Sequence, residues 1–292
     1  MSPPTLRRAY IAWIVVCLVW GTTYLAIRVA LETMPPMLMA SFRWLTAGVL
    51  LLIVLVARGE VLPARRDWPA LAVLGVLMMS FGNGGVVWAE QTVPSGLTAV
   101  LVSGVPFWMT GIEFVGFGGE ALSTRRIFGL ILGFAGIVLL VWPELQLGHS
   151  GAFLIGVAAT QVACFGWAVG SSLARRRHHE ENILAVSALQ MIFAGVSLLV
   201  VALAIGEWPA LAVNARTGSA LVYLIVAGSI VGYSAYAYAL RHLPVTTVSL
   251  YAYVNPVIAV VLGTLVLGEP FSSRVVVASA IVLVGIMLVR RT

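Results

Sequence analysis

The chain has 292 residues, of which 61% are hydrophobic and only 10% charged, against about 45–50% and about 25% in soluble domains. Its mean hydropathy is +1.03. A soluble domain needs a charged exterior and a disordered chain lacks this apolar content, so both are excluded. The composition indicates an integral membrane protein with no room for a soluble domain.

The net charge of +6 raises the question of nucleic-acid binding. All seventeen basic residues are arginines, and the absence of lysine excludes a P-loop lysine and Schiff-base chemistry with a cofactor. Cys17 and Cys164 lie in apolar segments without metal-type spacing, so neither a disulfide framework nor a metal site is expected. We therefore predict no cofactor and no metal.

Apolar stretches between charges and Pro or Gly breaks predict an all-α protein with ten membrane-spanning helices. The first stretch follows Arg7 and Arg8 and is longer than the core of a signal peptide, so it is expected to remain as a helix. In chain order the predicted spans are 9–31, 36–57, 68–89, 94–116, 126–142, 151–174, 182–206, 217–240, 245–267 and 273–289.

The arginines set the predicted orientation. With a cytoplasmic N-terminus, thirteen arginines fall on the inside, whereas Arg28, Arg216 and Arg274 fall outside and Arg43 lies within a span. The positive-inside rule then places both termini in the cytoplasm. The basic charge is thus a topology signal for a multi-pass membrane protein, and nucleic acid is excluded as a partner.

The two halves resemble each other at a shift of about 150 residues. Matches include Pro106 with Pro256, Gly82 with Gly232 and Gly136 with Gly285. The predicted domains are residues 9–142 and 151–289, each of five helices, and an odd number of helices makes the second copy inverted. Inverted repeats are typical of secondary transporters, whose substrate binds near the midplane between the halves.

Pro106 and Pro256 lie near the middles of the fourth and ninth predicted spans. Each removes a helical hydrogen bond, which frees the carbonyl groups of Val102 and Ala252. Because the breaks recur at matched positions, we favour paired hinges over the alternative that proline is simply common in membrane helices.

Ionisable groups inside spans are costly and usually functional. Arg43 lies about 10 Å inside the second span at 1.5 Å per residue, and Glu90 ends the third span on the same outer side. Two interpretations stay open: a structural ion pair, or Arg43 receiving a substrate carboxylate while Glu90 gates or titrates. Glu113, toward the cytoplasmic end of the fourth span, is interpreted as structural.

Polar and aromatic side chains predict the walls of a cavity. Asn83 shares a helix face with Glu90, and the repeat places Tyr233 and Tyr236 on an opposing face. Trp20 and Tyr24 lie four residues apart in the first span. Trp167 lies two residues after Phe165, which is the repeat equivalent of Trp20. Aromatic side chains near the midplane of the membrane suit amphipathic ligands.

Catalysis is not predicted. All four histidines fall in connections, and the only aspartate, Asp67, lies in a cytoplasmic loop. An intramembrane protease needs either paired carboxylates or a nucleophile with a nearby base, and neither arrangement is present.

Several runs resemble the EamA branch of the drug/metabolite transporter superfamily: Trp20-Gly21-Thr22-Thr23-Tyr24, Ala89-Glu90-Gln91, Tyr251-Ala252-Tyr253-Val254-Asn255-Pro256 and Gly268-Glu269. The resemblance covers nearly the whole chain. It implies two inverted five-helix repeats, a central cavity lined mainly by helices one to four and six to nine, and export of small metabolites such as amino acids or drugs. Tyr253 joins the expected substrate-binding residues on this basis.

Together with this resemblance, the sequence predicts an exporter of small amphipathic metabolites in the bacterial cytoplasmic membrane. Amino acids are the first candidate substrates, and transport is expected to work by alternating access. A multidrug or other metabolite exporter of the same fold and a passive channel are the alternatives. The expected partners are the small-molecule substrate and the lipid bilayer, and the protein is expected to be a monomer or a weak homodimer.

Overall fold

The computed structural model describes residues 3–116, 124–147, 151–177, 181–243, 248, 251–269 and 272–290. This described part is helical and contains no strand. Helices occupy each of the ten predicted ranges. Their bounds are α1 (Pro3–Ala30), α2 (Pro36–Ala57), α3 (Trp68–Gly75), α4 (Gly85–Ala89), α5 (Ser95–Val102), α6 (Val105–Gly116), α7 (Thr124–Leu147), α8 (Gly151–Arg175), α9 (Ile183–Ala204), α10 (Ala215–Tyr223), α11 (Gly232–His242), α13 (Tyr251–Leu267) and α14 (Ser273–Arg290).

Two of the long helices change from α-helical to π-helical geometry near their middle. A π-helical segment, η2 (Val76–Gly84), joins α3 to α4, and a second, η4 (Leu224–Val231), joins α10 to α11. Both composite helices therefore contain a stretch with i→i+5 bonding, which is rare and is often found at functional sites. Two short 3₁₀ turns, η1 (Arg65–Asp67) and η3 (Trp208–Ala210), lie in connections.

Six of these helices are long and apolar enough to cross a bilayer. They are Thr5–Ala30, Pro36–Ala57, Arg65–Ala89, Gly151–Ala174, Ile183–Ala204 and Ala215–His242. Four more apolar helices in the described residues are shorter: Ser95–Met109, Ile127–Gly136, Val254–Leu267 and Ser273–Gly285. The chain is therefore a membrane protein with several spans.

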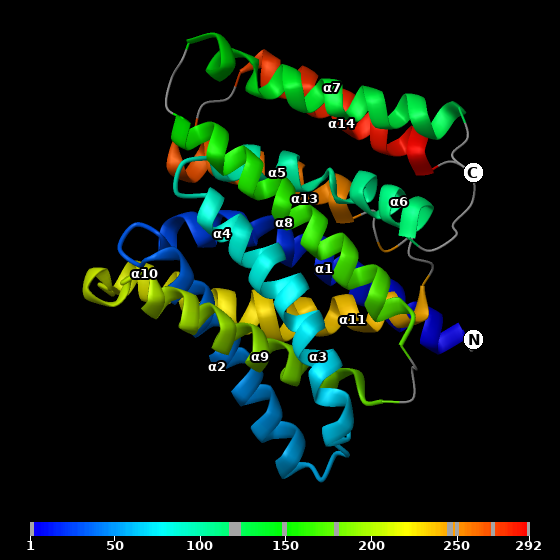
Figure 1. Ribbon diagram of the computed structural model, residues 1–292, viewed down its shortest axis with the longest axis vertical. Helices are drawn as coiled ribbons and strands as arrows, with labels where there is room; N and C mark the ends of the chain where they lie inside the picture. Colours follow the sequence, from blue (N-terminus) through cyan, green and yellow to red (C-terminus); the bar gives the residue numbers. More distant parts are fainter. Residues whose placement is uncertain are drawn as a thin grey trace.

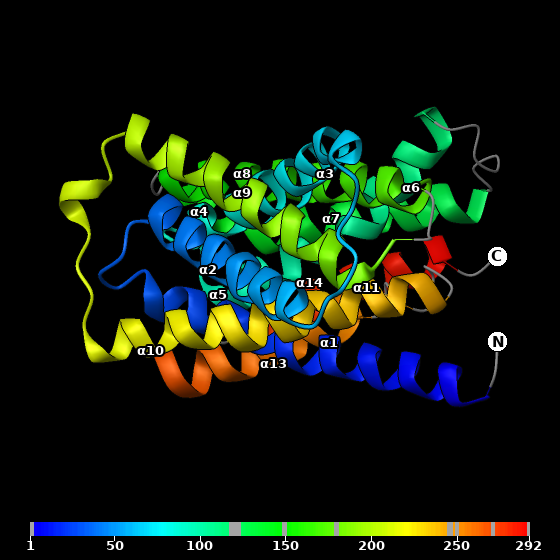
Figure 2. The same ribbon diagram turned by 90° about the horizontal axis from the view of Figure 1, so that it is seen from below.

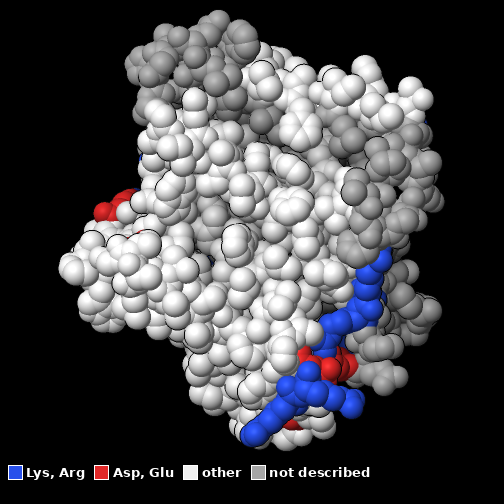
Figure 3. Space-filling model, viewed as in Figure 1, with Lys and Arg blue, Asp and Glu red and all other residues white. Residues whose placement is uncertain are grey.

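The start of α1 and the end of α14 lie at one end of the bundle, which we call the proximal end (Figures 1 and 2). The connection from α1 to α2 and the start of α10 lie at the opposite, distal end. Charged side chains gather at one corner of the surface, whereas most of the visible face is uncharged (Figure 3). Arg177 forms ion pairs with Asp67 at 3.6 Å and Glu181 at 3.0 Å in the connections of the proximal end.

Three helices end in the same way. Gly59, Gly206 and Gly268 have positive φ angles, which glycine adopts without strain and which end a helix.

Each of these glycines is followed by a glutamate whose carboxylate reaches the start of another helix. Glu60 accepts from the side chain of Asn182 at 2.8 Å, Glu207 accepts from the N–H of Leu38 at 2.8 Å, and Glu269 accepts from the N–H groups of Ser95 and Gly96 at 2.8 and 3.1 Å. Carboxylates at helix N-termini satisfy unpaired N–H groups and the helix dipole, so these Gly-Glu pairs tie neighbouring helices together.

The helix pairs α2 with α9 and α7 with α14 make the most extensive contacts in the bundle. Gly48 and Gly195 allow the backbones of α2 and α9 to approach closely: a Cβ atom at Gly48 would lie 2.8 Å from the Ala188 carbonyl oxygen, and one at Gly195 would lie 2.6 Å from the Leu45 nitrogen. Between these pairs, α1 packs on α13 and α11, and α8 packs on η2 and α6. The centre of the molecule is thus bounded by α1, η2, α8 and α13.

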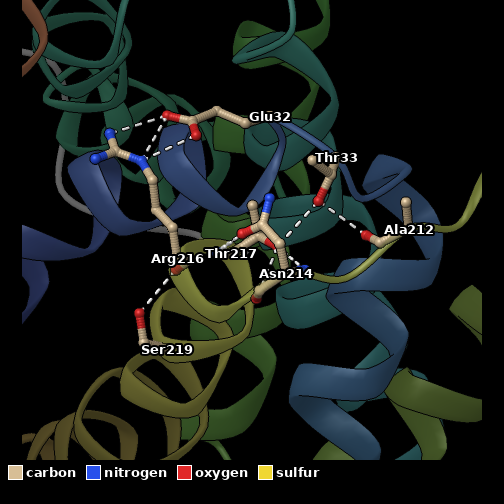
Figure 4. A network of polar contacts seen from close by, with 7 residues as sticks. All are labelled: Glu32, Thr33, Ala212, Asn214, Arg216, Thr217 and Ser219. Carbon is tan, nitrogen blue, oxygen red and sulfur yellow. Dashed lines mark hydrogen bonds and ion pairs between the residues drawn. The ribbon is translucent and has the colours of Figure 1, made fainter.

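A polar network closes part of the distal end (Figure 4). Arg216 at the start of α10 pairs with Glu32 at 2.9 Å. The Thr33 hydroxyl donates to the Ala212 carbonyl at 2.8 Å and is also hydrogen-bonded to the Thr217 hydroxyl at 2.9 Å. The connection from α1 to α2 is therefore held against the connection that precedes α10.

Candidate substrate-binding site

A cavity lies in the centre of the bundle. The centres of water molecules can occupy about 70 Å³ of it, which is room for several waters, because one needs roughly 10–15 Å³. Its walls combine apolar and aromatic side chains with a few polar groups, as is usual for small-molecule sites. The lining residues are Trp20, Thr23, Tyr24, Ile27, Arg43, Trp44, Gly82, Asn83, Val86, Val102, Val105, Ala163, Cys164, Trp167, Tyr251 and Asn255.

The cavity brings together five of the residues that the sequence predicted for substrate binding: Trp20, Tyr24, Arg43, Asn83 and Trp167. They come from α1, α2, η2 and α8. The others lie elsewhere. Tyr233 and Tyr236 are buried behind the wall, Glu90 is buried beyond it, and the side chain of Tyr253 lies outside the described residues. The side chain of Glu113, interpreted as structural, also lies outside them.

Arg43 is the charged residue of this wall and is only 2% exposed. Its Nε donates to Ser229 Oγ at 2.8 Å and its Nη1 donates to Asn83 Oδ1 at 3.1 Å. Its guanidinium also lies 4.6 Å from the centre of the Trp44 ring. Among the described residues no carboxylate lies within ion-pair distance of Arg43. The cavity thus contains a buried positive charge held by neutral groups.

Four aromatic rings form a cluster on the proximal side of the cavity: Trp20, Trp167, Tyr236 and Tyr251. Their centroids are 5.0 to 6.0 Å apart in five of the pairs. Trp20 precedes Tyr24 along α1, which begins at the proximal end, and Trp20, Trp167 and Tyr251 line the cavity, so this aromatic cluster forms its wall on that side. The Trp167 indole N–H lines the buried region and has no hydrogen-bond partner in the described part of the chain, which leaves a donor for a ligand.

Tyr233 belongs to the layer behind this wall. Its hydroxyl donates to Gln190 Oε1 at 2.8 Å, and its ring packs edge-on against Trp44 at 6.2 Å. Tyr233 is therefore not among the residues that line the cavity beside Asn83, although the sequence predicted that their faces oppose each other across it. Asn83 lies within the π-helical segment η2, and Tyr233 lies two residues after the end of η4. Each π-helical turn takes up an extra residue, so a face assigned from α-helical spacing is displaced.

The two prolines occupy different surroundings. Between α5 and α6 the helix is interrupted at Ser103 and Gly104, and Pro106 is the second residue of α6. Pro256 lies inside the continuous helix α13. The predicted break is thus visible near Pro106 in the first half, whereas in the second half the described helix continues through the proline.

Glu90 follows the last residue of α4 and is fully buried. Neither carboxylate oxygen has a hydrogen-bond partner among the residues described. Arg28 donates to the backbone carbonyl of Glu90, and Arg43 is bonded to Ser229 and Asn83. The structural ion pair between Arg43 and Glu90, one of the two interpretations of the sequence, is absent from this conformation.

The sequence profile of the EamA-like transporter family matches residues 7–142 and again residues 154–291. This chain belongs to the EamA-like transporter family. It is 36% identical over 276 residues to the uncharacterized inner membrane transporter YedA of Escherichia coli K12, covering 93% of this chain and 87% of that protein. It is 28% identical to the chloroplastic WAT1-related protein At3g02690 of Arabidopsis thaliana, over 92% of this chain and 66% of that one.

The fold also matches a solved crystal structure, with a TM-score of 0.71 at 20% sequence identity over 96% of each chain. At this identity the match concerns the fold alone. In this EamA-like transporter the central cavity lies among α1, α2, η2, α8 and α13.

Sequence reasoning missed several lining residues, among them Thr23, Trp44 and Asn255. When the Asn255 amide nitrogen faces the Cys17 and Tyr251 carbonyls, it donates to both, at 2.9 and 3.2 Å. Two signals were present: Asn255 is a polar residue inside a span, and it is four residues from Tyr251, so both lie on one face of α13.

Proposed function

We propose that this transporter exports small amphipathic metabolites that carry a carboxylate, with amino acids as the first substrate class, across the bacterial cytoplasmic membrane. Transport proceeds by alternating access between two inverted repeats of five membrane-spanning helices. The proximal end is the cytoplasmic end, so both termini are cytoplasmic. Transport requires no catalytic group and no cofactor.

The pattern of helix contacts supports the inverted repeats. Exchange of each helix in the first half for its equivalent in the second preserves several of the main contacts: α1 packs on α11 as α8 packs on η2, and α1 packs on α13 as α8 packs on α6. The pairs α2 with α9, α7 with α14 and α5 with α13 exchange with themselves. A pseudo-two-fold relation of this kind places the binding site between the halves.

Arg43 is the single observation that carries the substrate class. A buried guanidinium costs free energy unless an anion compensates it, and in the described residues its direct contacts are neutral. Its fork of N–H groups suits a carboxylate. A carboxylate entering the cavity would therefore supply the missing anion, while the aromatic cluster contacts the apolar part of the molecule.

The test uses purified protein in liposomes. Amino acids should exchange across the membrane in a counterflow assay and should raise the thermal midpoint of the protein, because a ligand that binds the folded state stabilises it. The matched control is the methyl ester of each amino acid, which keeps the side chain and removes the anion. Equal counterflow of acid and ester would overturn the carboxylate assignment, and conductance without counterflow would favour a channel.

The orientation has its own test. Tags at residues 1 and 292 should both be protected from external protease in intact cells. Exposure of one tag alone would contradict the inverted arrangement, because two repeats of five helices require both ends on one side. Exposure of both tags would contradict the cytoplasmic placement of the termini.

A further inference from the structure

Glu90 is the buried carboxyl group that the substrate-binding proposal does not use. It immediately follows the span Arg65–Ala89 and is 0% exposed, and both of its carboxylate oxygens lack a hydrogen-bond partner among the described residues. An ionised carboxylate in such surroundings is strongly destabilised unless it is paired, and a proton removes the penalty. The geometry therefore favours the neutral acid in this conformation.

The charged neighbours of Glu90 are already occupied. From α1, Arg28 donates to the Glu90 backbone carbonyl, and from α2, Arg43 donates to Ser229 and Asn83. After α13, Glu269 accepts the N–H groups of Ser95 and Gly96, the first residues of the next helix along from Glu90. Burial and then the Glu269 carboxylate raise the pKa of Glu90 well above its usual range, and Arg28 and Arg43 offset this only in part.

Two uncharged titratable groups complete the surroundings. Tyr24 of α1 and Cys164 of α8 line the central cavity and are buried. A phenol hydroxyl and a thiol are ordinarily uncharged at neutral pH, so neither supplies a counter-charge. Asn83 lies seven residues before Glu90, which places Glu90 about 10 Å further toward the distal end along the same composite helix.

Unsatisfied polar groups cluster around this position. The hydroxyls of Ser95 and Thr98 are also buried without a hydrogen-bond partner in the described chain, so three such side chains lie within nine residues of sequence. Buried polar groups are nearly always paired, and each exception needs an explanation. A conformation in which water enters the distal end would hydrate all three groups, which is what alternating access provides.

We infer that Glu90 is a proton-binding site linked to the opening of the distal end: its carboxyl group is protonated when that end is closed and ionises when that end opens to water. The inference rests on one part of the proposed function, which is that the distal end opens during transport. In the step, the O–H bond of the Glu90 carboxyl breaks, its electron pair stays on the carboxylate, and the proton passes to water on the distal side. Acid on that side stabilises the closed conformation, and alkali above the raised pKa favours the open one.

The first test measures protonation without substrate. Infrared spectra of the lipid-embedded protein should contain a C=O stretching band of a protonated carboxyl group at neutral pH, lost in Glu90→Gln and retained in Glu32→Gln. Glu32 is the matched control, a distal glutamate paired with Arg216 at the surface. Absence of the band from the wild type, or its persistence in Glu90→Gln, would overturn the inference whether or not carboxylates are transported.

The second test measures the link to opening. Spin labels at Gln91→Cys and Val213→Cys, two exposed distal positions, are introduced with the native cysteines replaced by alanine in every variant. Their separation should increase as pH rises when Glu90 is present and should stay at its low-pH value in Glu90→Gln. A separation that does not depend on pH, or a pH dependence that survives Glu90→Gln, would contradict the link.

Discussion

Equivalent positions in the two halves of the molecule hold two different polar pairs. Arg43 is the eighth residue of α2 and Gln190 the eighth residue of α9, and both helices have 22 residues. Arg43 bonds to Asn83 at 3.1 Å, and Gln190 accepts from Tyr233 at 2.8 Å. The same scaffold therefore supports a charged pair in the first half and a neutral pair in the second.

The difference between the two pairs shows how a symmetric fold can hold a binding site that is charged on one side only. The charged pair lines the cavity, whereas the neutral pair is buried behind Trp44. A charge in both halves would place two like charges around one small cavity, at a large desolvation cost. With a single guanidinium in the wall, an anionic substrate meets one preferred binding orientation.

The largest expected effect follows from making the first pair neutral, as the second pair is. Arg43→Gln removes hydrogen bonds to a charged group worth about 1.5–3 kcal/mol, so carboxylate binding in the liposome system should weaken about 10- to 100-fold. The thermal midpoint should stay constant or rise, because a buried neutral amide costs less than a buried charge. The matched control is Arg66→Gln, which alters a side chain that is 89% exposed at the proximal surface.

This prediction separates binding from stability. If Arg43→Gln lowered the thermal midpoint and left carboxylate binding intact, the guanidinium would be a structural group, and the comparison between the two pairs would carry no consequence for substrate choice.

A smaller effect is expected from the prolines, which also distinguish the halves. Pro256 lies within α13, where proline costs about 3 kcal/mol in a helix interior, whereas Pro106 lies at the start of α6, where its missing N–H costs little. Pro256→Ala should therefore slow exchange more than it weakens binding, and Pro106→Ala should change either one less. Counterflow rates and binding constants measured on both variants check this. If exchange slowed equally in both variants, the two prolines would act as a symmetric pair of hinges. If exchange slowed in neither, the prolines would not act as hinges in transport.

The sequence predicted the helices well and the site in part. Span positions follow from hydropathy and charge, which a single chain displays directly. Arg43, Asn83 and Trp20 could be predicted because polar or aromatic groups inside spans are conspicuous. Tyr233 and Glu90 were placed less well, because a helix that is apolar on most faces gives little sign of which face it buries, and because π-helical turns displace the faces that regular spacing predicts.

The smallest expected effect lies in the neutral pair. Tyr233→Phe removes one hydroxyl, and with it the hydrogen bond to Gln190, so unfolding should become easier by about 1 kcal/mol and the thermal midpoint should fall slightly. Carboxylate binding and counterflow should remain at the wild-type level, because neither residue lines the cavity. Loss of transport in Tyr233→Phe without loss of stability would instead place the neutral pair in the transport pathway. The polar pairs of both halves would then contribute to transport, rather than the charged pair alone.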